Sequence, residues 1–268
     1  MPHVDVGSGV ELYYEDFGSG RPLVFVHSGA ATHDMWDHQV YHLTERYRTV
    51  VYDHRGVGGS SKPRDGYTVQ QLADDLYALI HALELSDVTL VSHGLGGHVL
   101  LRCLATYPDA AARVCLVSAA PWYMGDKEGA GGFSESFFSG LNEGLARNNP
   151  QANWDLFEHY LFHKDPGEPM KHACLQMALA WPLYVWKELA KDLPLTDHRE
   201  YLPRITTPAL VAHGRHDRKN RYEGAEYLAE HLPNGKLVVF EHSAHSPFFE
   251  ELEEFNEALS DFIEAAAG

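Results

Sequence analysis

Basic residues, cysteines and long apolar runs are all scarce in this chain. It has 21 Lys and Arg against 38 Asp and Glu, which gives a formal net charge of −17 over 268 residues. That balance repels phosphate and so argues against nucleic acid and anionic membrane surfaces as partners. No apolar run approaches the roughly 18 residues of a membrane span, and residues 1–5 lack the basic start of a secretory signal. We expect a cytoplasmic monomer or homodimer whose partner is a small-molecule substrate.

The sequence also lacks the usual metal-binding motifs. The three cysteines include no CxxC pair, so neither a disulfide framework nor a zinc site is indicated. Among 18 histidines, His38 and His42 stand four positions apart, with His33 just before them. No H-E-x-x-H motif or other closed ligand set accompanies these three. We therefore expect no metal and no cofactor.

Short apolar runs of strand character are abundant. They cover residues 23–26, 49–52, 88–91, 114–117, 209–211 and 237–240. Continuous apolarity indicates strands buried on both faces, as in a mostly parallel sheet covered by helices. Helical periodicity separates the runs, and after the second run Thr68 and Gln71 form a candidate capping box. The pattern predicts a doubly wound α/β fold, with Val10 to Phe17 in an antiparallel hairpin at its start.

The strand pattern breaks in the middle of the chain. From about Tyr123 to Pro203 no strand-like run is visible, and helices are predicted over residues 137–146, 154–162 and 172–190. A helical segment of this size, between a strand ending near Ser118 and one starting near Ala209, is typical of an inserted cap. We expect an α/β core over residues 1–121 and 204–268, and a helical cap over residues 122–203.

Five polar segments follow predicted strands, at the edge where ligands bind in open α/β sheets. They are His27 to Ala30, Asp53 to Ser60, Ser92 to Gly97, Gly214 to Asp217 and Ser243 to Phe248. In this order they resemble the α/β-hydrolase superfamily, within it the capped branch of proline iminopeptidases, enol-lactone hydrolases, epoxide hydrolases and related esterases. The resemblance implies an acid at Asp217 and a base at His245. Such a carboxylate fixes the imidazole tautomer, while the other ring nitrogen takes a proton from the reacting group.

The nucleophile elbow departs from the superfamily pattern. Its centre normally carries Ser, Cys or Asp, and the register of this chain places Gly94 there. Ser92 carries the only hydroxyl of the motif, but it stands two residues early, still on the strand. By position, the backbone amides of Gly29 and Leu95 are the expected oxyanion hole. The family usually has glycine directly after the first histidine, where this chain has Ser28.

Residues near these motifs and in the cap are candidates for binding the substrate. They are Ser28, Trp36, His93, Trp122, Phe137, Trp154, Trp181 and Trp186. The aromatic members favour an apolar or aromatic substrate of moderate size over a sugar or a phosphate. Asp53 and Arg55 resemble a second-strand motif of the family, whose role is to order loops around the site.

A glycine at the elbow leaves three functions open. The first is a serine-type hydrolase of an ester or lactone that has lost its nucleophile and is inactive or traps substrate. The second is an enzyme with a native Gly94, in which His245 and Asp217 form a general-base dyad for cofactor-free oxygenase, lyase or decarboxylase chemistry. The third is a ligand-binding receptor derived from a hydrolase. Retention of both dyad residues weighs against a pure binder, and the otherwise complete site favours the first function.

Overall fold

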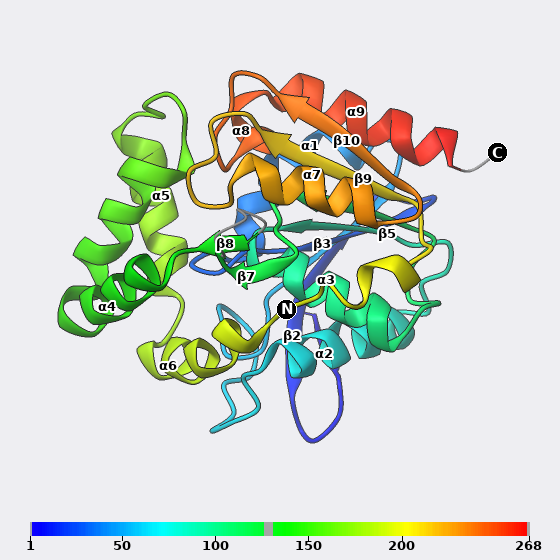
Figure 1. Cartoon of the computed structure of the whole chain (residues 1–268). Helices are drawn as coiled ribbons and strands as arrows, with labels where there is room; N and C mark the ends of the chain where they lie inside the picture. Colours follow the sequence, from blue (N-terminus) through cyan, green and yellow to red (C-terminus); the bar gives the residue numbers. More distant parts are fainter. Residues whose placement is uncertain (1, 126–130, 267–268) are drawn as a thin grey trace.

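An eight-stranded sheet forms the centre of the computed structural model, which describes residues 2–125 and 131–266 (Figure 1). The spatial order of its strands is β1-β2-β4-β3-β5-β6-β9-β10. Their bounds are β1 His3–Asp5, β2 Glu11–Phe17, β3 Pro22–Val26, β4 Arg48–Tyr52, β5 Thr89–His93, β6 Arg113–Val117, β9 Ala209–Gly214 and β10 Gly235–Phe240. β1, β2 and β4 pair antiparallel in turn, and the other neighbours pair in parallel. The predicted mostly parallel sheet and the antiparallel start are confirmed.

Helices cover both faces of this sheet. On β3, Val24 and Val26 belong to one hydrophobic cluster, whereas Leu23 and Phe25 belong to a second on the opposite face. This alternation follows from the two-residue period of a strand, and burial on both faces explains why the run is continuously apolar. The first cluster packs under α2 Val69–Ala82, α3 Leu95–Thr106 and α7 Tyr222–His231. The second packs under α1 Asp37–Leu43, α8 Pro247–Glu250 and α9 Leu252–Ala265.

Helix α2 begins directly after Thr68, where the candidate capping box predicts it to begin. Thr68 has extended backbone angles, and its side-chain oxygen accepts a hydrogen bond from the Gln71 amide at 3.1 Å. The hydroxyl thereby satisfies an amide that has no partner within the helix.

The insertion between β6 and β9 lies to one side of the sheet (Figure 1). Its helices are α4 Glu135–Leu156, η2 Phe157–Leu161, α5 Glu168–Leu179, α6 Leu183–Asp192, η3 Leu193–Leu195 and η4 Leu202–Arg204. The helical insertion between these two strands is confirmed. Its division from the core at residues 122 and 203 stays a prediction. The predicted ranges also take in residues 1, 126–130 and 267–268, which lie outside the described part.

Two details of the insertion differ from the sequence prediction. The single helix predicted over residues 172–190 is wrong, because Pro182 separates α5 from α6. The prediction that the insertion contains no strand is also wrong, since β7 Trp122–Met124 and β8 Gly131–Phe133 lie in it and pair in parallel. Strands of three residues are too short for an apolar period to show in the sequence. Within α4, Asn148 leaves helical geometry just before Asn149 and Pro150, where the sequence predicts a break.

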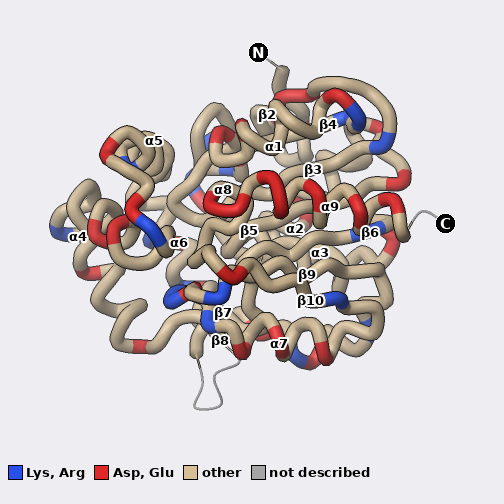
Figure 2. Tube along the Cα trace, turned by 90° about the horizontal axis from the view of Figure 1, so that it is seen from above, with Lys and Arg blue, Asp and Glu red and all other residues tan. Residues whose placement is uncertain are grey.

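Charge on the surface is mostly acidic. Asp and Glu are spread over the outer helices α7, α8 and α9 (Figure 2). Across the described ranges, no helix combines the length and the apolarity that crossing a membrane requires.

Candidate active site

His245 and Asp217 follow two neighbouring parallel strands, β10 and β9. His245 Nδ1 donates a hydrogen bond to Asp217 Oδ2 at 2.7 Å, and both side chains are fully buried. Asp217 Oδ1 accepts from the backbone amides of Lys219 at 2.8 Å and Asn220 at 2.9 Å. The carboxylate is thus held in one orientation. It keeps the imidazole proton on Nδ1, so the lone pair of Nε2 is available to act as a base.

Burial controls the protonation of this pair. It holds the pKa of His245 well below its usual range, and the positive charge of Lys219 lowers that pKa further. Burial also raises the pKa of Asp217 to about 6, a shift opposed by His213 and by the hydrogen bonds from the backbone. At neutral pH the imidazole is therefore uncharged beside an ionised carboxylate. Within the described chain, the buried Nε2 of His245 has no hydrogen-bond partner.

Gly94 forms the sharp turn between β5 and α3. Its φ of 52° and ψ of −112° lie in a region where a residue with a side chain is strained and glycine is not. A Cβ added to Gly94 would lie 3.3 Å from His245 Nε2. Position 94 therefore faces the base from the place expected for a nucleophile, and its glycine contributes no reacting group.

Ser28 occupies the space that a side chain at position 94 would need. Its Oγ lies 2.5 Å from the point where a Cβ on Gly94 would stand. The side chain is 3% exposed, and its hydroxyl is without a hydrogen-bond partner in the part of the chain that the structure describes. Cβ atoms in proteins essentially never approach another atom so closely. The present rotamer of Ser28 and a side chain at position 94 thus exclude each other.

The two residues predicted to supply the oxyanion hole lie next to each other. Leu95 is the first residue of α3, so its amide has no acceptor within the helix. A Cβ on Gly29 would lie 3.5 Å from Leu95 Cδ2. Both residues line a small cavity of about 30 Å³ together with Gly94. The use of their amides to bind an oxyanion stays a prediction.

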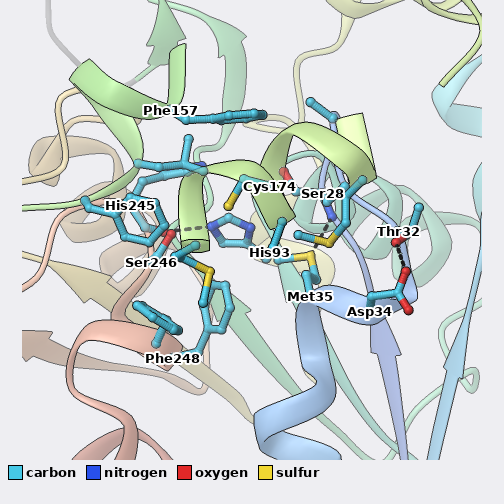
Figure 3. A pocket seen from close by; sticks show the side chains of 18 of the residues that line it. Ser28, Thr32, Asp34, Met35, His93, Phe157, Cys174, His245, Ser246 and Phe248 are labelled. Carbon is cyan, nitrogen blue, oxygen red and sulfur yellow. Dashed lines mark hydrogen bonds between the residues drawn. The ribbon is translucent and has the colours of Figure 1, made fainter. Parts of the chain in front are cut away.

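A larger cavity of about 460 Å³ lies beside His245 (Figure 3). Ser28 and Phe248 line it from the core, and Phe157 of η2 and Cys174 of α5 line it from the insertion. Its other apolar side chains include Met35, Leu156, Leu161, Phe162, Met170, Met177 and Phe249. A cavity of this size with mostly apolar walls and a few polar groups is typical of a small-molecule site.

Three of the predicted binding residues lie at these cavities. Ser28 and His93 line the larger one, and Trp186 lines the smaller one. His93 Nε2 also donates a hydrogen bond to the backbone oxygen of His245 at 2.7 Å. That bond fixes the loop that carries the base, so His93 has a positioning contact as well as a place in the cavity wall.

The other five predicted residues do not line either of these two cavities. Trp36 is fully buried in the core, against Phe25 and Phe248. Trp122 lies under Arg199, Phe137 stacks on Phe133, Trp154 packs on His172, and Trp181 donates to Ala31 O at 2.7 Å. The aromatic residue types alone did not indicate which helix faces point to the cavity.

Sequence reasoning missed Lys219. This residue lines both cavities, and in the described residues its ammonium group has no hydrogen bond or ion pair. Burial lowers its pKa to about 8, although Asp217 acts in the opposite direction. Its place two residues after Asp217 was the signal available in the sequence. The apolar wall from Phe157 and Cys174 had no such signal.

Asp53 and Arg55 lie outside the cavity and hold loops. Asp53 accepts hydrogen bonds from the His33 ring at 2.8 Å and from the Gly59 amide at 2.8 Å. Arg55 forms a buried, two-point ion pair with Asp75. These contacts fit the loop-ordering role implied by the resemblance. Over the described ranges, no group of three or more His, Cys, Asp or Glu residues is placed to hold a metal ion.

Known proteins of one fold family are similar to this chain over most of its length. A family model of the alpha/beta hydrolase fold matches residues 21–162 and 179–252. A non-heme chloroperoxidase from Kitasatospora aureofaciens is 32% identical over 98% of this chain and 99% of its own. A bifunctional esterase/perhydrolase from Acinetobacter calcoaceticus is 30% identical, also over 98% and 99%. The solved structure of an esterase from Exiguobacterium antarcticum superposes with a TM-score of 0.92 at 30% identity, over 98% of each chain.

Proposed function

Because the chain belongs to the α/β-hydrolase family, we propose that it hydrolyses an ester or lactone of an apolar or aromatic small molecule, with His245 as its base. The observation that carries this proposal is the state of the His245 ring. Its Nδ1 is held by Asp217, and its buried Nε2, beside a cavity of about 460 Å³, has no hydrogen-bond partner among the described residues. Two of the similar proteins are named as esterases, which supports ester chemistry at this site.

The chemistry follows from the geometry of the dyad. His245 Nε2 accepts the proton of an attacking hydroxyl or water, and Asp217 stabilises the imidazolium that forms. The amides of Gly29 and Leu95 stabilise the negative charge that develops on the carbonyl oxygen. His245 then returns the proton to the departing alkoxide. Exclusion of water by the apolar walls strengthens each of these electrostatic contacts.

A second function suits a Gly94 that is native to the chain. Its φ of 52° is one that glycine adopts without strain, and the position beside His245 Nε2 then carries no reacting group. In that case the dyad also suits proton abstraction from a bound substrate, as in lyase, decarboxylase or cofactor-free oxygenase chemistry.

One set of variants separates these functions. The chain as given, Gly94→Ser and His245→Ala are assayed on a panel of aryl esters and lactones. His42→Ala is the matched control, because His42 is an exposed histidine of α1. We expect turnover by the chain as given, and its loss in His245→Ala by about 10²–10⁴-fold, the usual contribution of a general base. His42→Ala leaves turnover unchanged.

The other outcomes each favour a different function. Turnover that appears only in Gly94→Ser identifies a hydrolase disabled at the elbow. Binding without turnover in every form identifies a receptor. Absence of ester and lactone hydrolysis, with His245-dependent exchange of substrate protons into water, identifies the proton-abstraction enzyme and overturns the proposed hydrolysis.

A further inference from the structure

The Ser28 hydroxyl and the Nε2 atom of His245 converge on one point in the site. Ser28 Oγ lies 2.5 Å, and His245 Nε2 3.3 Å, from the position of a Cβ on Gly94. Both atoms are buried, and neither has a hydrogen-bond partner in the described residues. Burying a polar atom without a partner is costly, so two such atoms at one point indicate a site that a reacting group completes.

The hydroxyl beside His245 thus comes from a different loop than the one on which the superfamily pattern places it. The superfamily pattern places glycine at the position of Ser28 and the nucleophile at the position of Gly94. Here the two residue types are exchanged. Ser28 follows β3 and Gly94 follows β5, and these strands are parallel neighbours whose carboxyl ends meet at the site. The exchange thus keeps the serine within the same small volume.

We propose that Ser28 is the nucleophile of this enzyme, with His245 as its base and Asp217 as the acid of the triad. The inference rests on the proposed ester or lactone hydrolysis. Serine has a single heavy-atom side-chain torsion, so rotation about the Cα–Cβ bond of Ser28 is the motion that redirects its hydroxyl. Because Gly94 has no Cβ, no side chain of residue 94 fills the point that lies near both Ser28 Oγ and His245 Nε2.

The covalent steps balance without any added reagent. Ser28 Oγ bonds to the carbonyl carbon, its proton passes to His245 Nε2, and the carbonyl electron pair moves onto oxygen. Collapse breaks the bond to the leaving alkoxide, which takes the proton from His245. Water, deprotonated by His245, then attacks the Ser28 acyl ester. Its cleavage releases the carboxylic acid and returns the proton to Ser28 Oγ.

A fluorophosphonate probe followed by peptide mapping tests the assignment. We expect the adduct on the peptide that contains Ser28, and no adduct in Ser28→Ala or His245→Ala. Ester turnover by Ser28→Ala and by Ser28→Gly falls at least about 100-fold, because the loss of a nucleophile costs far more than the loss of a binding contact. The matched control is Ser92→Ala, which removes an equally buried hydroxyl that donates to Cys115 O at 3.2 Å within the sheet. It keeps both label and turnover.

The double variant Ser28→Gly with Gly94→Ser gives a second readout. It restores the residue order of the superfamily, and we expect the label to move to the peptide that contains position 94. Ester turnover that survives in Ser28→Ala, with no label on Ser28 in the unaltered chain, overturns the assignment and leaves His245 acting directly on water. Turnover lowered in Ser28→Ala without any Ser28 adduct or burst overturns it too, and makes Ser28 a positioning residue. If no form hydrolyses an ester or lactone, the proposed function itself fails.

Discussion

Ser28 Oγ lies 2.5 Å from the position that a Cβ on Gly94 would occupy. The two residues belong to different loops, yet they compete for the same volume beside His245. Because of this competition, neither position can be interpreted alone. A change at residue 94 acts on Ser28, and a change at residue 28 determines what position 94 can hold.

The free energy of unfolding should depend on the competition between Ser28 and a side chain at position 94. Gly94→Ser is expected to lower the free energy of unfolding by about 1–3 kcal/mol, since it adds a side chain at positive φ and displaces Ser28. Adding Ser28→Gly removes the clash, so the double variant is expected to be more stable than the sum of the single effects by about 1 kcal/mol. Denaturant melts of all four forms measure this coupling.

The control for that cycle is Gly140→Ser. Gly140 lies in α4, and a Cβ there meets no atom within 4 Å. We expect a small stabilisation, because serine forms helix better than glycine. A Gly94→Ser protein more stable than the unaltered chain, or zero coupling in the cycle, contradicts the described backbone and the Ser28 contact.

The pH dependence of turnover should depend on Lys219. Its positive charge lowers the pKa of His245 and that of Asp217. Both groups must be deprotonated for His245 to act as the base, so activity is lost as pH falls through their pKa values. Lys219→Met removes the charge and raises both pKa values, which moves the acid limb of kcat/KM to higher pH by about 0.5–1 unit. The limb should keep its position in Lys219→Arg. An unmoved limb in Lys219→Met, or one shifted to lower pH, contradicts this account.

The size of the substrate should depend on Cys174. This side chain lines the large cavity from α5 and is 6% exposed. Cys174→Phe narrows the cavity, so KM for bulky naphthyl esters is expected to rise about tenfold, while small phenyl acetates are affected less. Leu179→Phe is the control, since Leu179 lies on the same helix and is 45% exposed. If the two variants change KM for naphthyl esters equally, Cys174 does not contact the substrate.

Arg55 should matter for stability and not for chemistry. Its side chain is 7% exposed and that of its partner Asp75 is 2% exposed. Arg55→Ala leaves a buried carboxylate without its partner and is expected to lower the free energy of unfolding by about 3–5 kcal/mol. Arg48→Ala breaks a more exposed pair with Asp16, and its expected cost is about 0–1 kcal/mol. Denaturant melts compare the two, and kcat of folded Arg55→Ala should stay near that of the unaltered chain. A stability loss no larger than that of Arg48→Ala would exclude a structural role for the buried pair.

Much of the core could be predicted because its signals are local. Continuous apolar runs predict buried parallel strands, and Thr68 caps α2 through a contact only three residues long. The resemblance to the family implied that Asp217 and His245 act together, and both residues follow predicted strands. Carboxyl ends of neighbouring parallel strands share one edge, so loops far apart in sequence are brought together.

The insertion was harder to predict because its helix faces are fixed by packing against the core. Trp181 was predicted to bind substrate, yet its indole N–H donates to Ala31 O and its ring is buried. Cys174 and Phe157 line the cavity instead, and nothing in their spacing distinguishes them from other apolar residues of the insertion. An aromatic side chain serves equally well in a core or in a pocket wall, so composition does not separate the two.

The apolar runs were enough to predict the sheet, because their signal is local. The resemblance of the motifs to the family implied an acid at Asp217 and a base at His245, with Gly94 at the elbow. Which side chain lies beside Gly94 could be seen only in the folded chain. Ser28 reaches Gly94 through the pairing of β3 with β5, a contact that no local pattern encodes. Lys219 likewise faces the base only because β9 and β10 lie side by side. Pairing of distant strands therefore determines which side chains meet beside His245.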